Sequence, residues 1–124
     1  MDTVNRAQLV SRYLEVWNET DADRRQSMVN VTWETDGSYT DPLFAVRGHD
    51  QIAGLIGGFQ HQYPGLRFVQ TGDVESHHNL ARFTWDLVTL EGHIVAKGMD
   101  VALIAPDERL TAVAGFFDQA PDLG

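Results

Sequence analysis

The chain has 124 residues, of which 43% are hydrophobic, and its formal net charge at pH 7 is -9. This length predicts one domain, residues 1–124, with enough apolar side chains for a core and a lined cavity. The acidic balance argues against nucleic acids and anionic membranes as partners, because both are negatively charged. The chain has no cysteine, which excludes disulfides and thiolate chemistry.

The segment 1–6 has no basic stretch followed by an apolar run, so we expect no signal peptide. No apolar stretch approaches the length of a membrane span. These two observations predict a cytoplasmic protein.

The first half of the chain predicts three helices. Apolar residues recur at helical spacing from Ala7 to Trp17. Asp21 is of the residue type that caps a helix at its start, and the segment Tyr63–Gly65 contains a proline and a glycine that stop one. The expected helices cover residues 3–19, 22–30 and 49–61.

Strands are expected between the second and third helices and after the third. Residues 33–36 are expected to turn through Gly37 into a short strand, which Pro42 ends because proline cannot continue regular pairing. Short connections in the second half predict antiparallel neighbours, and helices followed by such a meander indicate the α+β class. The expected strands cover residues 38–41, 66–75, 80–90, 94–104 and 110–118, with a further extended segment at 43–46.

The pair Glu91–Gly92 predicts a two-residue hairpin turn, and this turn specifies which residues face each other across two strands. A large ring opposite a glycine is a favourable cross-strand fit. In this register, Asp100 shares a face with aromatic side chains, whereas Asp86 lies on the other face. The expected pairs are Trp85 with Gly98, Phe83 with Asp100, Leu87 with Ala96, and Asp86 with Lys97.

Two aspartates lie within expected strands and are flanked by residues that favour burial. They are Asp41 in the segment Tyr39–Pro42 and Asp100 in the segment Gly98–Val101. A carboxylate there is costly unless it is paired, hydrogen-bonded or protonated. Two such groups in one small domain indicate a pocket with acid/base chemistry. The structural alternatives are that Asp41 is a turn residue before proline, and that Asp100 pairs with a buried donor such as Tyr13 or a tryptophan N–H.

The motif Tyr-x-Asp-Pro at 39–42 and the motif Gly-x-Asp at 98–100, in a chain of helices followed by a meander, resemble the NTF2-like superfamily. Within it, the chain is most similar to the SnoaL-like and ketosteroid-isomerase-like branch, over residues of about 5 to 118. The resemblance implies a cone-shaped α+β roll in which three N-terminal helices pack on a curved, mostly antiparallel sheet. It also implies a ligand pocket between the layers and a homodimer through the outer sheet face.

The resemblance further implies catalytic roles for three residues. Asp41 stands at the position of the base, while Tyr13 and a protonated Asp100 stand where they would hold an enolate oxygen. Ketosteroid isomerase is the established case of a carboxylic acid kept neutral so that it can donate a hydrogen bond. The expected lining of the pocket is apolar and suits a flat ligand. It consists of Trp17, Trp33, Phe44, Phe59, Phe83, Trp85, Val113 and Phe117, with Phe116 as the alternative in the last strand.

The chain departs from ketosteroid isomerases at Ile56, which stands where their supporting tyrosine lies. The Asp–Arg–Asp set of the related epoxide hydrolases is also absent, since Lys97, Gly98 and Gly115 occupy the region where parts of it would lie. These departures bear on the substrate more than on the pocket.

No His-x-x-x-His or His-x-His pair occurs, so we expect neither a metal nor a cofactor, and His61 is only a weak candidate for the pocket. The expected function is a cofactor-independent isomerase or cyclase that transfers protons on an apolar carbonyl compound. The alternatives are a non-catalytic ligand-binding domain and a dimerising interaction domain.

Overall fold

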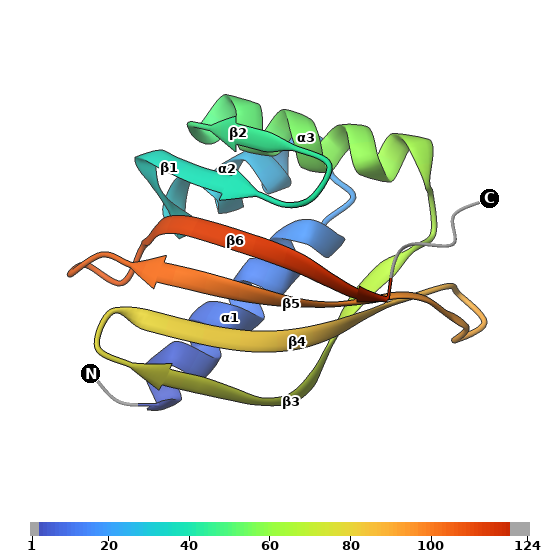
Figure 1. The fold of residues 1–124 in the computed structure, drawn as a ribbon. Coiled ribbons are helices and arrows are strands. Elements are labelled where there is room, and N and C mark those ends of the chain that lie inside the picture. The colour runs from blue at the N-terminus through green and yellow to red at the C-terminus, as the bar shows by residue number, and fades with distance from the viewer. Residues whose placement is uncertain (1–2, 120–124) are drawn as a thin grey trace.

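The computed structural model describes residues 3–119, in which three helices pack on a curved six-stranded sheet (Figure 1). The start of the segment expected to lack a signal peptide lies outside the described residues. The strand order is β2-β1-β6-β5-β4-β3, and every pairing is antiparallel except that of β1 with β6. The helices are α1 (Thr3–Asn18), α2 (Ala22–Thr32) and α3 (His49–Gln62). The strands are β1 (Trp33–Thr40), β2 (Ala45–Arg47), β3 (Arg67–His77), β4 (Leu80–Val88), β5 (Ile94–Ile104) and β6 (Leu110–Gln119).

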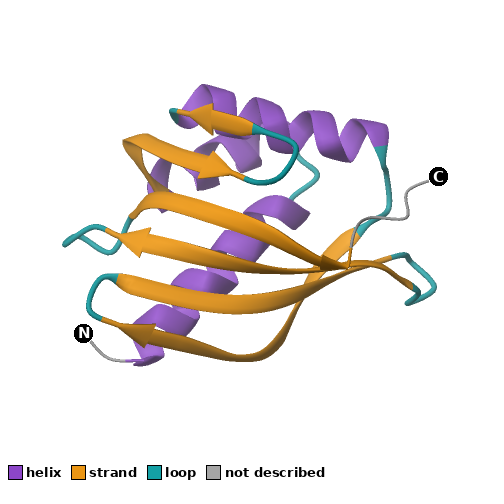
Figure 2. Cartoon of the chain, in the orientation of Figure 1, coloured by secondary structure: helices purple, strands orange, loops and turns teal. Residues whose placement is uncertain are grey.

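The expected α+β architecture is confirmed, with α1 crossing one face of the sheet and α2 and α3 lying beside β1 and β2 (Figure 2). The predicted cap of α2 is also confirmed, because the Asp21 side chain accepts a hydrogen bond from the backbone N–H of Arg24 at 2.9 Å. This helix continues to Thr32, beyond the predicted end. None of the described helices is both long enough and apolar enough to pass through a membrane.

The expected turn through Gly37 is wrong, because β1 runs without interruption from Trp33 to Thr40. Gly37 instead lies in a β-bulge, where the register of β1 with β6 shifts between Trp33 and Ser38. A Cβ at Gly37 would lie 2.8 Å from Cδ1 of the Trp33 ring, so the backbone there must approach that ring closely. A bulge bends a strand without removing it from its sheet. As expected, regular pairing ends before Pro42.

The register expected between β4 and β5 is confirmed, including the pairs Trp85–Gly98 and Phe83–Asp100. The two-residue turn that suggested it is wrong. The strands end at Val88 and resume at Ile94, and a register shift after Leu87 accommodates the longer loop. Backbone hydrogen bonds close this loop, for example from Thr89 N–H to the carbonyl of His93 at 2.9 Å. A hydrogen bond between backbone groups cannot be predicted from the side chains of the loop.

The parallel pairing of β1 with β6 positions the candidate site. It places Thr40 opposite Ala114, so that Asp41 comes next to Gly115 in the neighbouring strand. Gly115 in turn pairs with Asp100 on β5. Two aspartates far apart in the sequence therefore approach one glycine from its two sides.

Candidate active site

Asp100 lies on the inner face of β5 and is only 3% exposed. The hydroxyl of Tyr13 donates to Oδ2 of Asp100 at 2.7 Å, and Nε1 of Trp85 donates to Oδ1 at 3.0 Å. Burial raises the pKa of Asp100 from 3.8 to about 6, although the hydrogen bonds from Tyr13 and Trp85 act in the opposite direction. The nearby Asp41 contributes to the increase through charge repulsion.

These partners limit where Asp100 can carry a proton. An indole N–H only donates, so Oδ1 must remain an acceptor for Trp85, and a bound proton belongs on the Oδ2 side towards Tyr13. With a pKa of about 6, roughly one Asp100 in ten is protonated at pH 7 without a bound anion. An anion beside Asp100 increases that fraction, because like charges disfavour the ionised carboxyl.

Tyr13 is held on α1 by aromatic neighbours. The rings of Trp33 and Phe83 both lie 5.5 Å from its ring, and all three side chains are almost completely buried. Burial raises the pKa of Tyr13 well above 10, and the charge of Asp100 adds to this effect. The phenol therefore stays protonated at neutral pH and acts as a hydrogen-bond donor. Trp33 and Phe83, expected in the pocket lining, support Tyr13 from the core.

Asp41 is half-buried and directly follows β1. Its Oδ1 accepts hydrogen bonds from the backbone N–H groups of Leu43 and Phe44, both at 2.8 Å. Its Oδ2 accepts one from the hydroxyl of Tyr39, also at 2.8 Å. The structural alternative for Asp41 is thus observed, since it closes the turn after β1. The same contacts fix the direction of its carboxyl group beside the inner face of the sheet.

Gly115 lies between the Asp100 and Asp41 side chains. A Cβ added to this glycine would lie 2.8 Å from Oδ1 of Asp100 and 3.6 Å from Cβ of Asp41. It would also lie 3.5 Å from the hydroxyl of Tyr39. Any larger residue would fill the space that separates Asp100 from the Tyr39–Asp41 pair.

A small cavity of about 10 Å³ adjoins Asp100. This volume accommodates the centre of about one water molecule. Nε1 of Trp17 is buried and lines the cavity, and it makes no hydrogen bond of regular geometry with the described residues. It does act on the neighbouring Tyr13 hydroxyl, where it opposes the increase in the pKa of that phenol. A ligand oxygen in the cavity would therefore offer this N–H a better acceptor. The lining consists of Tyr13, Leu14, Trp17, Tyr39, Phe68, Trp85 and Asp100.

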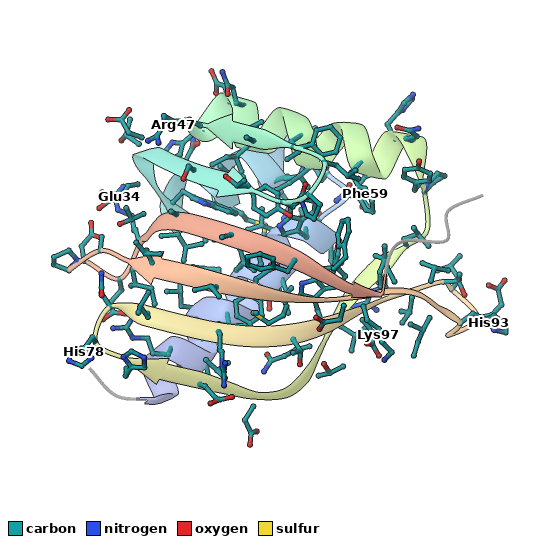
Figure 3. The ribbon with its side chains drawn as sticks, in the orientation of Figure 1. Glu34, Arg47, Phe59, His78, His93 and Lys97 are labelled. Atoms are coloured by element: carbon teal, nitrogen blue, oxygen red, sulfur yellow. The ribbon has the colours of Figure 1, made fainter. Side chains whose placement is uncertain are left out.

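Aromatic rings close one side of the cavity. The Phe68 ring lies 5.3 Å from that of Trp17 and 5.1 Å from that of Trp85, and Phe117 contacts Trp85 at 6.3 Å. Phe59 points from α3 towards the sheet (Figure 3) and lies 5.8 Å from Phe68. Phe59, Phe68 and Phe117 are only half-buried, so they separate the cavity from solvent.

The remaining expected lining residues lie elsewhere. Phe44 is 49% exposed in the segment after β1, and Val113, on the inner face of β6, is completely enclosed in the core. Phe116 is 54% exposed and points to the side of β6 opposite Phe117. His61 is exposed near the end of α3, away from Asp100. Among residues 3–119, no group of three His, Asp or Glu side chains is arranged to hold a metal ion.

Tyr39, Phe68 and Gly115 were not predicted as site residues. The sequence does contain a signal for Tyr39, because residues two apart in a strand share a face and Tyr39 precedes Asp41 by two. No comparable signal exists for Gly115, whose role depends on the pairing of β6 with both β1 and β5.

No protein-family model and no curated protein matches this sequence. Among solved structures, a protein from Agrobacterium tumefaciens, described as a candidate isomerase of the SnoaL-like family, is 36% identical with a TM-score of 0.90. The match covers 93% of this chain and 98% of that protein. A SnoaL-like protein of unknown function from Burkholderia thailandensis is 14% identical, with a TM-score of 0.74 and coverage of 94% and 98%.

A candidate SnoaL-like polyketide cyclase from Jannaschia is 18% identical, with a TM-score of 0.68 and coverage of 90% and 85%. The two more distant matches establish the fold, and the 36% identity over nearly the whole length of both chains establishes the family. The chain therefore belongs to the SnoaL-like family of the NTF2-like fold.

Proposed function

We propose that this protein is a cofactor-independent acid/base enzyme of the isomerase or cyclase type, which moves a proton at a carbon atom beside a carbonyl group. The observation that carries the proposal is the buried Tyr13–Asp100 hydrogen bond beside a small cavity, with Asp41 on the other side of Gly115. The descriptions of two similar structures, a candidate isomerase and a candidate polyketide cyclase, support the same reaction class.

In this mechanism, Asp41 takes the proton from the carbon atom, and negative charge develops on the carbonyl oxygen. The Trp17 Nε1–H, which makes no regular hydrogen bond with the described residues, donates to this oxygen. Tyr13 and Asp100 supply further donors in those molecules in which Asp100 has already taken up a proton from solvent. The proton on Asp41 then returns to a different carbon atom in an isomerisation. In a cyclisation, the enolate attacks a second carbonyl group, and the proton on Asp41 goes to the alkoxide that this attack forms.

The size of the cavity limits what reaches Asp100. About 10 Å³ suffices for a single oxygen atom, not for a ring system. The remainder of an apolar substrate must enter between the half-buried rings of Phe59, Phe68 and Phe117, which have to move apart. The ligand is therefore expected to be an apolar small molecule, because these aromatic rings line its path to Asp100.

The binding part of the proposal is tested by titrating a planar phenol, such as equilenin, into wild type and Asp100→Asn and following its absorbance from pH 5 to pH 8. Phenolate mimics the enolate, so we expect binding by wild type and at least tenfold weaker binding by the variant. Asp86→Asn is the matched control, because Asp86 pairs with Lys97 outside this network. A folded wild type that binds no phenol overturns the proposal.

The catalytic part is tested by deuterium exchange into carbonyl compounds, followed by NMR. Asp41→Asn is expected to abolish exchange while phenol binding persists. The second candidate function is a ligand-binding domain without turnover, favoured by the three hydrogen bonds that already occupy the Asp41 carboxylate. Phenol binding without exchange by wild type assigns the protein to this second function.

We also propose a homodimer through the outer face of the sheet. Phe116, Val69 and Leu103 are 54%, 43% and 37% exposed, and apolar side chains in such positions are typical of a contact surface. Sedimentation of wild type and Phe116→Glu tests this, since the added charge is expected to shift a dimer towards monomer. A wild type that sediments as a monomer contradicts the dimer.

A further inference from the structure

A second depression, which we call the Arg25 groove, lies apart from the Asp100 cavity and has a volume of about 500 Å³. This volume lies within the range of small-molecule pockets, and it greatly exceeds that of the cavity beside Asp100. The groove is formed by the ends of α1 and α3, the start of α2 and β3, and the loop between β4 and β5. It is lined by Asn18, Thr20, Arg25, Gly57, Gln60, His61, Tyr63, Pro64, Gly65, Leu66, Arg67 and Leu90.

Arg25 is a charged side chain held in one orientation. It is only 8% exposed, and its Nη1 donates to the carbonyl of Glu19 and to Oε1 of Gln60, both at 2.9 Å. Gln60 is itself fixed, because its Nε2 donates to the carbonyl of Trp17 at 2.7 Å. A guanidinium held in this way loses little side-chain freedom when it binds a ligand.

The opposite edge of this guanidinium lies against a glycine. A Cβ at Gly57 would be 2.8 Å from Nη2 of Arg25 and 3.5 Å from its Cζ. Among the described residues, only Nη1 of Arg25 donates hydrogen bonds, and none accepts from Nη2 or Nε. Arg25 therefore retains N–H donors of the kind that bind a carboxylate or phosphate in a two-pronged manner.

The charge around the groove favours an anion. Its lining contains two arginines, Arg25 and Arg67, and no aspartate or glutamate, in a chain whose net charge is -9. Arg24, by comparison, forms an ion pair with Glu19. Within residues 3–119, neither Arg25 nor Arg67 forms an ion pair with a carboxylate.

One wall of the groove is apolar. Leu90 is 80% exposed on the hairpin loop, and a Cβ at Gly65 would lie 3.6 Å from its side chain, so Leu90 leans over the start of β3. Leu66 and Pro64 continue this apolar side of the lining. The groove thus combines paired cationic donors with an apolar wall.

We propose that the Arg25 groove is a second ligand site that binds a small amphipathic carboxylate. Arg25 and Arg67 hold the carboxylate, and the apolar body of the ligand lies against Leu66, Pro64 and Leu90. The site is separate from the acid/base chemistry around Asp100, so it stands whether or not the protein catalyses proton transfer.

Octanoate is the probe, and backbone amide chemical shifts of the full chain locate its binding. We expect saturable shifts at Gly57, Gln60, Arg67 and Leu90, with little change at Asp100. Arg67 is exposed, so Arg67→Ala leaves the fold intact and is expected to weaken octanoate binding at least tenfold. Arg12→Ala is the matched control, because it removes the same charge from an exposed position on α1.

1-Octanol, which has the same chain without the charge, is expected to bind at least tenfold more weakly than octanoate. Equal affinity for octanol and octanoate overturns the proposal, because the groove would then recognise only the apolar chain. An absence of saturable shifts at the groove, shifts confined to the surroundings of Asp100, or equal effects of Arg67→Ala and Arg12→Ala also overturn it.

Discussion

The indole ring of Trp85 occupies the position that a side chain at Gly98, its partner on the facing strand, would take. A Cβ at Gly98 would lie 2.6 Å from both Cε2 and Cη2 of Trp85. The same indole donates through Nε1 to Asp100, two residues beyond Gly98 on β5. The glycine thus allows the tryptophan to lie flat on the sheet and reach the buried carboxylate.

Gly98→Ala is accordingly expected to destabilise the protein by roughly 1–3 kcal/mol, because the ring must shift in a close-packed region. Denaturation in urea measures the loss, and near-ultraviolet circular dichroism detects the displaced tryptophan. Gly54→Ala is the contrasting control. No atom lies within 4 Å of a Cβ at Gly54, which is exposed on α3, so a gain of roughly 0.5–1 kcal/mol is expected. Equal effects of the two substitutions would contradict this account.

Stability is expected to depend on pH through Asp100. Its pKa is about 6 in the folded protein against 3.8 ordinarily, so the folded state binds more protons between these values. The stability that protonation of Asp100 provides is fully present below pH 3.8 and is lost as the pH rises through 6. The difference corresponds to about 3 kcal/mol.

Asp100→Asn removes this dependence, since the amide can accept from Trp85 and donate to Tyr13. We therefore expect the variant to be more stable than wild type at pH 7, with the gap narrowing towards pH 4. Urea denaturation of both proteins across this range measures the difference. A gap that does not change with pH would show that Asp100 has an ordinary pKa in the folded protein.

Asp41 is expected to contribute to the turn after β1 as well as to chemistry. Asp41→Ala leaves the N–H groups of Leu43 and Phe44 without their acceptor, and a loss of about 1–2 kcal/mol is expected. Asp41→Asn retains an acceptor oxygen at Oδ1, so its stability is expected to stay within about 0.5 kcal/mol of wild type. If the alanine variant is as stable as the asparagine variant, the turn does not depend on this side chain.

Trp17→Phe tests the indole N–H beside the cavity. The variant removes a donor that makes no regular hydrogen bond, so we expect about tenfold weaker phenol binding, with a loss of stability of roughly 1–2 kcal/mol from the space that the smaller ring leaves. Trp33→Phe is the matched comparison. The Trp33 indole donates to the carbonyl of Ser38 at 3.3 Å and is fully buried, so its loss is expected to lower stability more than phenol affinity. Unchanged phenol affinity in Trp17→Phe would exclude the indole from the ligand site.

Local patterns determined much of this protein. The spacing of apolar residues predicted the first helix, and the cap at Asp21 follows from its own side chain and the next turn of backbone. The alternation of side chains across neighbouring strands was enough to place Asp100 with Phe83 and Trp85, even though the turn was of a different type. These features depend on residues close in sequence or joined by one hairpin.

Tertiary structure decided the rest. The parallel pairing of β1 with β6 joins distant segments and carries no local signal, yet it brings Asp41 to Gly115 and so to Asp100. The small cavity and the position of the Trp17 indole N–H beside it likewise depend on how rings from four elements pack together. The sequence by itself singled out Asp41 and Asp100 and determined which face of the sheet Asp100 takes. Their meeting at one glycine required the assembled sheet, because only long-range pairing brings those strands together.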